Sequence, residues 1–231
     1  MTSAPTPKNE KDRLAAVRRY AILDTAPESM FDDVVQLVSY ICQTPIAYIG
    51  IIDKDRQWFK SKKGLDTPET SRDIAFCAHA ILETHTMVVP DALADQRFAN
   101  NPLVLSAPKI RFYAGSPLIT EDGYAVGTLC AVDHVPRNLT EDQLKALQTL
   151  AKQTVALLEL HRSHSELQDA LNQIRILGGL LPICSNCKKI RDERGQWVVL
   201  EGYIQSHSEA TFTHGTCPEC YAKLYGDRLR R

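Results

Sequence analysis

The segment Arg111-Phe-Tyr-Ala-Gly-Ser-Pro-Leu-Ile-Thr-Glu-Asp-Gly-Tyr-Ala-Val-Gly-Thr-Leu-Cys-Ala-Val-Asp133 contains two apolar runs on either side of the turn sequence Glu121-Asp-Gly123. Two such runs joined by a short turn with glycine are typical of a β-hairpin. Upstream, Ile46-Ala-Tyr-Ile-Gly-Ile-Ile52 is rich in β-branched residues and apolar on both faces. The sequence therefore predicts strands near Arg111–Thr120 and Tyr124–Asp133, and a buried strand at Ile46–Ile52.

Helices are predicted before and between these strands. In the segment that ends at Pro45, apolar residues recur every three or four positions, as on one face of a helix. They are Phe31, Val34, Val35, Val38, Ile41 and Cys42. Shorter helices are expected at Asp12–Leu23 and Ala75–Leu82, and shorter strands at Gln57–Lys60 and Met87–Asp91. Helices and strands interspersed in this way indicate an α+β fold.

A long helix is predicted from Thr140 to Leu177. Thr140 is a favourable N-cap, with Gln143 three residues later. Apolar residues then fall on a seven-residue repeat, at Leu150, Leu157, Leu160, Leu167, Leu171 and Ile174, which only Gln153 and His164 interrupt. Such a seam predicts a coiled coil and hence a homodimer, while packing of the helix on its own domain is the alternative, expected at least for its first two turns. Gly178-Gly179 and Pro182 are expected to end the helix.

Four of the seven cysteines lie in two Cys-x-x-Cys pairs near the C-terminus. The pairs are Cys184/Cys187 and Cys217/Cys220, and His214 is a spare candidate ligand. Two residues between cysteines let both sulfurs turn toward one point, as a tetrahedral metal requires, so we expect a structural Zn site with four thiolates. Redox-active pairs, disulfides and plain buried thiols are the alternatives. The order of a turn followed by a helix that carries the last ligands resembles a treble-clef zinc module.

Composition excludes several functional classes. The 231 residues carry a formal net charge of −1, which gives no electrostatic footprint for nucleic acid or an anionic membrane. No apolar run is long enough to span a bilayer, and the polar, proline-containing N-terminus lacks the apolar core of a secretory signal. We therefore expect a cytoplasmic protein that binds neither nucleic acid nor membrane.

The stretch from about Pro27 to Leu158 resembles a GAF domain, a sensory fold of bacterial regulators. Seven segments carry the resemblance: Tyr20–Glu28, Phe31–Asp33, Asp53–Lys60, Arg72–His79, Asp95–Pro102, Arg111–Leu118 and Gly127–Asp133. The resemblance implies a central antiparallel sheet with helices packed on one side and a ligand pocket beneath loops on the other.

The segment Leu181–Tyr225 separately resembles a cysteine module found at the ends of bacterial GAF, PAS and response-regulator proteins. We accordingly expect four parts: a polar tail and helix at 1–26, a GAF sensory domain at 27–158, a signalling helix at 159–178 and a zinc-binding module at 179–231.

Five residues of the GAF-like part are candidate ligand contacts: Trp58, Cys77, His79, Tyr113 and Cys130. The resemblance places the pocket between the sheet and the segment Phe76–His79, with Tyr113 and Cys130 on its floor. The alternative is that Cys77 and Cys130 are small buried hydrophobes and that His79 is a hydrogen-bonded core residue. Asp91, Asp95, Arg97 and Arg111 are expected to form structural ion pairs, with ligand contacts as the alternative.

The sequence favours a cytoplasmic signal-transduction sensor that is not an enzyme. Its GAF domain is expected to bind a small ligand of unknown identity or a protein partner, and to relay the change through a dimeric helix to the zinc module. Signalling proteins such as histidine kinases are candidate partners. The alternative function is a free methionine sulfoxide reductase that uses Cys77 and Cys130; a reachable thiol with a lowered pKa would favour it.

Overall fold

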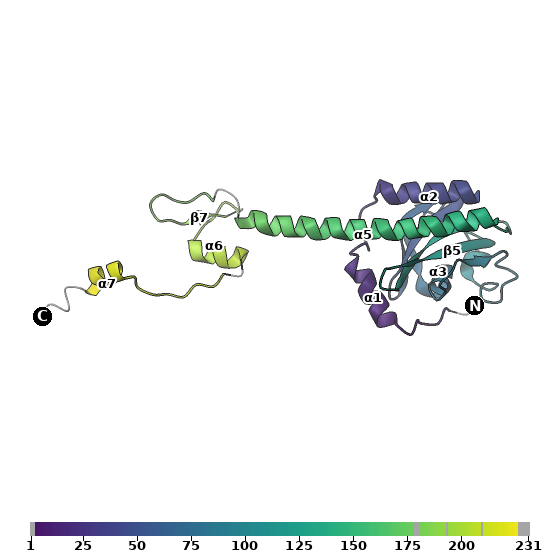
Figure 1. The fold of residues 1–231 in the computed structure, drawn as a ribbon, viewed down its shortest axis with the longest axis horizontal. Coiled ribbons are helices and arrows are strands. Elements are labelled where there is room, and N and C mark those ends of the chain that lie inside the picture. Colours follow the sequence, from purple (N-terminus) through teal and green to yellow (C-terminus); the bar gives the residue numbers. More distant parts are fainter. Residues whose placement is uncertain (1–2, 178–180, 193, 209, 226–231) are drawn as a thin grey trace. The chain divides into compact units, whose positions relative to one another are not determined.

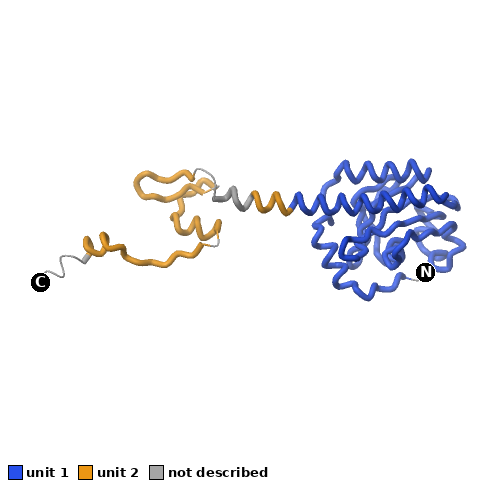
Figure 2. Tube along the Cα trace, in the orientation of Figure 1, with its two compact units in different colours: residues 1–165 blue, residues 166–231 orange. Residues whose placement is uncertain are grey.

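The computed structural model of the chain describes residues 3–177, 181–192, 194–208 and 210–225. It divides into two compact units, residues 1–165 and 166–231, which Figure 2 distinguishes by colour. The helix end expected at Gly178-Gly179 lies outside the described residues. Each unit is considered below by itself.

A six-stranded antiparallel sheet forms the centre of the first unit. Its strands follow the order β3-β2-β1-β6-β5-β4. Their bounds are β1 Ile46–Ile52, β2 Arg56–Lys63, β3 Glu69–Ser71, β4 Met87–Val89, β5 Phe112–Ile119 and β6 Ala125–Asp133. The hairpin read from the sequence is the pair β5 and β6, and the buried strand is β1, which β2 and β6 flank. The antiparallel α+β fold is thus confirmed.

Three helices pack on one face of this sheet. They are α1 (Glu10–Arg19), α2 (Ser29–Cys42) and the first part of α5 (Glu141–Leu177). Buried residues of all three join alternate residues of β1, β5 and β6 in one apolar cluster. Helices α2 and α5 run side by side over the sheet, as Figure 1 shows, and the Gln143 side chain of α5 donates a hydrogen bond to the Ile41 carbonyl of α2 at 2.9 Å.

The other face of the sheet is covered by short segments. They are η1 (Arg72–Ile74), α3 (Phe76–Ala80) and α4 (Pro102–Leu105), with their connecting loops. Phe76, Cys77 and Val104 from these segments pack with the remaining residues of β1, β5 and β6 in a second apolar cluster. This is the face on which a GAF-like fold is expected to hold its ligand.

Close approach of two strands requires glycine at the centre of the sheet. A Cβ built on Gly127 of β6 would lie 2.2 Å from the Gly50 carbonyl oxygen of β1, well inside van der Waals contact. Gly127 lies opposite Ile51 in the β1–β6 pairing, and the backbones can approach at this point because Gly127 carries no side chain.

Helix α5 begins as the sequence predicts. The Gln143 amide nitrogen donates to the Thr140 hydroxyl at 3.2 Å, and the Thr140 amide nitrogen donates to the Gln143 side chain at 3.0 Å. These reciprocal bonds form a capping box, which satisfies two amide groups that the helix itself leaves unpaired.

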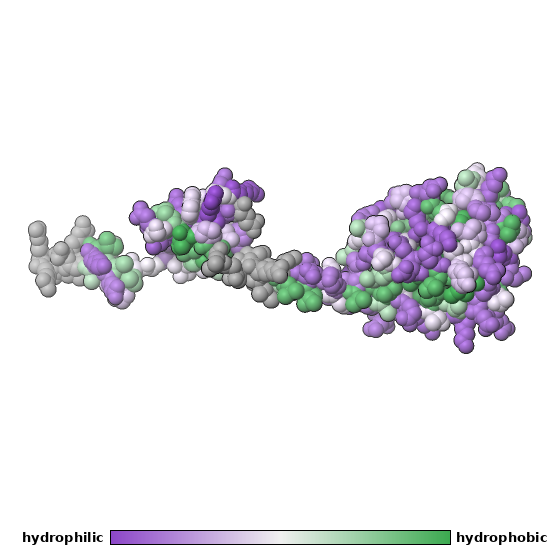
Figure 3. All heavy atoms as spheres, turned by 90° about the horizontal axis from the view of Figure 1, so that it is seen from above, coloured by the Kyte–Doolittle hydropathy of each residue, from purple (hydrophilic) through white to green (hydrophobic). Residues whose placement is uncertain are grey.

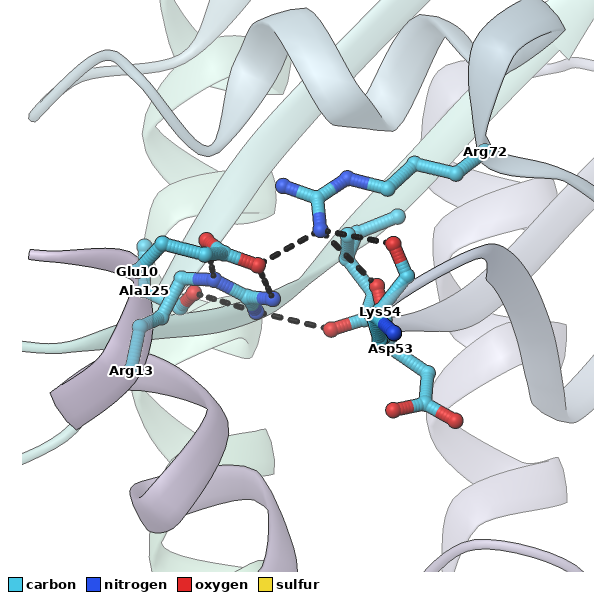
Figure 4. A network of polar contacts seen from close by, with 7 residues as sticks. Glu10, Arg13, Asp53, Lys54, Arg72 and Ala125 are labelled. Atoms are coloured by element: carbon cyan, nitrogen blue, oxygen red, sulfur yellow. Dashed lines mark hydrogen bonds and ion pairs between the residues drawn. The ribbon is translucent and has the colours of Figure 1, made fainter. Parts of the chain in front are cut away.

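A buried polar network fastens α1 to the sheet (Figure 4). The Arg13 guanidinium, 1% exposed, donates to both carboxylate oxygens of Glu10 at 2.7 and 2.8 Å and to the Ile52 carbonyl at 2.7 Å. Arg72 donates to the same Glu10 carboxylate at 2.6 Å and to the carbonyls of Asp53 and Lys54. One carboxylate thus joins the N-terminal helix to the end of β1 and to η1.

In its described residues, the second unit contains two short strands and two short helices besides the end of α5. They are β7 (Ile190–Arg191), β8 (Trp197–Val198), α6 (Leu200–His207) and α7 (Pro218–Tyr225). Among its described residues only Ile190 and Tyr203 are buried. Such a small core supplies little stabilisation by itself. In the part of the chain that the structure describes, we find no helix with the length and apolarity needed to cross a membrane.

Candidate functional site

Two thiols and two phenols meet on the loop-covered face of the sheet. Cys77 comes from α3, Cys130 from β6, Tyr48 from β1 and Tyr113 from β5. The Cys77 and Cys130 sulfurs lie 3.5 Å apart, and the Tyr113 hydroxyl lies 3.4 Å from each of them. The Tyr48 hydroxyl lies 3.4 Å from the Cys77 sulfur. Three of the sequence-predicted ligand contacts are therefore neighbours: Cys77, Tyr113 and Cys130.

The two thiols differ in their acidity. Burial by itself would raise the pKa of Cys77, but hydrogen bonds from Cys130, Thr128, Tyr113 and Tyr48 outweigh burial and lower that pKa from 9.0 to about 7. Burial, followed by the interaction with Cys77, raises the pKa of Cys130 well above its usual value. The pair therefore consists of one activated thiol and one thiol that keeps its proton.

Both thiols are completely enclosed, with an exposed fraction of 0% each. This burial agrees with the alternative that Cys77 and Cys130 are small core residues. Their hydrogen bonds to each other and to the tyrosines are a further feature, which packing of two small apolar side chains does not need. A catalytic thiol for methionine sulfoxide must be reachable by that substrate, and these enclosed thiols are not reachable by a molecule of that size.

His79 and Trp58 occupy other surroundings. The His79 ring packs edge-on against Phe98, with ring centroids 4.9 Å apart, and Phe98 stacks on Phe76 at 4.0 Å. His79 therefore borders the same layer as the thiols. Trp58 belongs to the apolar cluster on the opposite face of the sheet, which also contains residues of α1, α2 and α5. The structure thus separates Trp58 from the other four candidate contacts.

A cavity of about 50 Å³ lies beside the thiol cluster. Its lining is mainly apolar and includes Tyr48, Phe76 and Phe59. Two side-chain oxygens in this lining, Gln57 Oε1 and Thr70 Oγ1, are buried and have no hydrogen-bond partner among the residues that the structure describes. Unpartnered buried oxygens are costly, so they indicate a place where a small polar guest would be stabilised.

Sequence reasoning missed Tyr48, Thr128, Gln57 and Thr70. Tyr48 lies directly opposite Cys130 in the β1–β6 pairing, and Gln57 lies opposite Thr70 in the β2–β3 pairing. Only the strand register reveals these neighbours, and the register cannot be read from one sequence when both faces of a strand are apolar.

The charged residues near the loops form ion pairs, as expected. Arg111 binds both oxygens of Asp91 at 2.8 and 2.9 Å, and Arg97 binds both oxygens of Asp95 at 2.6 and 3.0 Å. These bidentate pairs fix the loops around β4 and give the four side chains a structural role.

The C-terminal cysteines form two local pairs. The Lys188 amide donates to the Cys184 carbonyl at 3.0 Å, which closes the turn that contains Cys187, and the Cys220 amide approaches the Cys217 sulfur at 3.5 Å. Backbone amides near each first sulfur lower the pKa of Cys184 and of Cys217, as suits thiolate ligands. Among the described residues, however, no three His, Cys, Asp or Glu side chains gather closely enough to hold a metal ion. Each pair fits half of a four-thiolate site, and the zinc site and the role of His214 stay predictions.

Comparison with known proteins identifies the larger unit. A model of the GAF domain matches residues 26–158. The chain belongs to the GAF domain family.

Two solved structures show the same fold: a domain of a sensor histidine kinase protein from Sinorhizobium meliloti and the GAF domain of a phosphoenolpyruvate-protein phosphotransferase from Acinetobacter. The first is 18% identical with a TM-score of 0.51, and the match covers 63% of this chain and 99% of that one. The second is 16% identical with a TM-score of 0.51, and the match covers 68% and 96%.

One curated relative is similar in sequence. It is a cyclic di-GMP phosphodiesterase of Pseudomonas aeruginosa, 40% identical over 164 residues. The match covers 71% of this GAF chain but only 28% of the length of that relative.

The relative corrects one expectation. We expected a protein that is not an enzyme, and a relative of this similarity that is named a phosphodiesterase contradicts that expectation. The expectation rested on the GAF-like residues, in which we could identify no combination of nucleophile, base and orienting group. A regulatory domain can nevertheless belong to an enzyme whose catalytic residues lie in another domain. Membership of the GAF family supports a sensory and regulatory role of the domain itself.

Proposed function

We propose that this protein is a regulator in bacterial cyclic di-GMP signalling, in which the GAF domain at 27–158 receives the signal. The observation that carries the proposal is the 40% identity to a cyclic di-GMP phosphodiesterase over 71% of the chain. Membership of the GAF family supports the sensory role. In this account the signal changes the rate at which cyclic di-GMP is degraded.

The input is a small molecule or a protein rather than cyclic di-GMP itself. The cavity beside Tyr48 has a volume of about 50 Å³. Sites for drug-sized ligands occupy roughly 300–1,000 Å³, whereas a water molecule needs roughly 10–15 Å³. A guest of a few heavy atoms fits this cavity without rearrangement, and a dinucleotide does not.

The proposed relay is a dimeric α5. Leu150 and Leu157, which lie beyond the first two turns, are partly buried against the domain's own core. Further along, Leu160, Leu167 and Leu171 are 55%, 58% and 45% exposed. On α2, Leu37 and Tyr40 are exposed as well, and a band of hydrophobic surface runs along the helical side of the domain (Figure 3). A second copy of the chain, packed along the seven-residue repeat, would cover the α5 leucines.

The proposed output end is the cysteine module at 179–231, stabilised by one structural Zn²⁺. Cys184, Cys187, Cys217 and Cys220 would hold the ion, and a metal bound by four protein thiolates keeps no open position for catalysis. The near absence of an apolar core in the described part of this unit supports the need for a metal. We propose signalling proteins as the partners of this module.

Reduction of free methionine sulfoxide is the second candidate function. The lowered pKa of Cys77 and its contact with Cys130 favour it. Complete burial of both sulfurs and the small cavity oppose it, because the substrate is larger than the space beside the thiols. Steady turnover of methionine sulfoxide by the purified chain, lost on Cys130→Ser, would establish this second function.

Deletion of the gene in its own host tests the proposed function. Cellular cyclic di-GMP, measured by mass spectrometry, should change in the deletion strain and return to the parental concentration when the wild-type gene is restored. Equal concentrations in parent, deletion and restored strains, under conditions in which the protein is produced, would contradict it.

A further inference from the structure

The thiol pair has the geometry of a disulfide that has not yet formed. Cys77 and Cys130 lie 53 positions apart in sequence, and their sulfurs are 3.5 Å apart. A disulfide bond is about 2.05 Å long, so the sulfurs need only a small approach of α3 toward β6. Cys42, by contrast, is buried without such a partner and has a pKa that burial raises to about 11.

The surrounding hydroxyl groups give the two sulfurs different environments. Tyr113 donates to the Cys77 sulfur, and the Tyr48 hydroxyl contacts the same atom, so that a thiolate at Cys77 is stabilised inside the core. Thr128 Oγ1 lies 3.0 Å from the Cys130 sulfur. A nucleophilic thiolate beside a protonated resolving thiol is the arrangement that favours oxidation to a disulfide.

We propose that Cys77 and Cys130 form a reversible disulfide when the protein meets hydrogen peroxide, and that this bond is an oxidative input of the GAF domain. The Cys77 thiolate attacks one peroxide oxygen, the O–O bond breaks, and the departing oxygen takes the former Cys77 proton to give water and Cys77 sulfenic acid. The Cys130 sulfur then attacks the Cys77 sulfur, the S–S bond forms, and the hydroxyl group leaves with the Cys130 proton as a second water. The two thiols lose two electrons, and one peroxide is reduced to two waters.

Size explains why the oxidant is a peroxide of this kind. The cavity of about 50 Å³ is lined by Tyr48, which contacts Cys77, and by Phe76, the residue before Cys77. Hydrogen peroxide consists of two oxygens with two donors, and the unpartnered oxygens of Gln57 and Thr70 can accept from them. Glutathione disulfide and protein thiols cannot enter this space.

The bond would restrain the layer that covers the sheet. Cys77 lies on α3, whose first residue, Phe76, lines the cavity, whereas Cys130 lies in the central strand β6. A covalent link between them removes the freedom of α3 to move away from the sheet, and so fixes the state of the ligand-binding face. That this state then regulates cyclic di-GMP turnover rests on the proposed function; the disulfide chemistry does not.

The test uses the full chain and mass spectrometry. Reduced protein is treated with hydrogen peroxide, its free thiols are alkylated under denaturing conditions, and the digest is searched for linked peptides. We expect a Cys77–Cys130 peptide that increases with peroxide and disappears with dithiothreitol, while Cys42 stays alkylated as the matched buried control. Free Cys77 and Cys130 after peroxide has oxidised the exposed tail cysteines would overturn the proposal.

Two variants separate chemistry from folding. Cys130→Ser should leave a Cys77 sulfenic acid, because the resolving thiol is gone, and a dione reagent added as the protein is denatured should label it. Tyr113→Phe keeps both thiols but removes a donor to Cys77, so the disulfide should form several-fold more slowly with the same final yield. An unchanged rate in Tyr113→Phe, together with no labelling of Cys130→Ser, would show that Cys77 is not the activated thiol and would overturn the mechanism.

Discussion

At the scale of single residues, the Glu10 carboxylate is the clearest case of a side chain whose role follows from its surroundings. Burial alone would raise its pKa, but hydrogen bonds and charges of Arg13 and Arg72 lower that pKa from 4.5 to about 2. The carboxylate therefore stabilises the folded protein in its ionised form, and it neutralises a guanidinium that is almost completely buried.

Glu10→Gln should lower the free energy of unfolding by about 1–3 kcal/mol at neutral pH, since it replaces charge-assisted hydrogen bonds. A lowered folded-state pKa means that the contribution is complete above pH 4.5 and declines as pH falls toward about 2. Urea unfolding of both proteins at several pH values measures the difference. Glu69→Gln is the control, because its pair with Arg56 is 45% exposed on the carboxylate side and should matter little. A loss that is the same for both variants would contradict this account.

At the scale of helices and strands, the sequence predicted those elements that carry a strong local pattern. The apolar runs of β1, β5 and β6 and the capping box of α5 are local signals, and the structure contains these elements. The face of the sheet to which the Trp58 side chain points could not be predicted in the same way. Residues on a strand alternate between faces, and a register shift at Ile49 and Gly50 in the β1–β2 pair changes which neighbours they meet. The cluster of Cys77, Cys130 and the two tyrosines likewise depends on three strands and a helix meeting in space.

Gly127→Ala should disrupt the β1–β6 pairing at the centre of the sheet. The added methyl group would meet the Gly50 carbonyl at 2.2 Å, where backbone rather than a flexible side chain must move. We expect a loss of about 3 kcal/mol or more in the free energy of unfolding, measured by near-ultraviolet circular dichroism in denaturant.

The matched control is Gly202→Ala in α6, where a Cβ would meet no atom within 4 Å. This change should stabilise its helix by up to about 1 kcal/mol and leave the sheet unaffected. Equal stability of Gly127→Ala and the wild-type protein would show that the strands do not approach as described.

At the scale of the whole molecule, the proposed regulator depends on two assemblies: a dimer along α5 and a metal that orders the tail. The exposed leucines of α5 support the first, and the two cysteine pairs with activated first thiols support the second. Each assembly can be tested without knowledge of the ligand.

Charge on the α5 seam should abolish dimer formation. The double variant Leu160→Glu and Leu167→Glu places carboxylates at two exposed seam positions and should sediment as a monomer, whereas the wild-type chain sediments as a dimer. Asp169→Lys, at an exposed position off the seam, is the control and should remain dimeric. A monomeric wild-type chain, or dimers of all three proteins, would contradict the seam.

The purified chain should contain one zinc per protomer by elemental analysis. Cys217→Ser should lose the metal and unfold the tail, because a structural zinc contributes on the order of 10 kcal/mol to such a small unit. Cys42→Ala removes a thiol but no proposed ligand, and should keep the metal. A closed four-ligand site should be filled in metal-replete protein. Wild-type protein that contains less than half a zinc per chain under these conditions would rule out this site.

The concentration of cyclic di-GMP in cells tests the central claim most directly. A deletion strain is complemented in parallel with the wild-type gene, with the seam variant Leu160→Glu/Leu167→Glu and with the control Asp169→Lys, at matched protein levels. We predict that the wild-type and control genes restore the parental concentration and that the seam variant does not, because the GAF signal is relayed through a dimeric α5. Restoration by all three genes would contradict the relay, and a concentration that never depends on the gene would contradict the regulator itself.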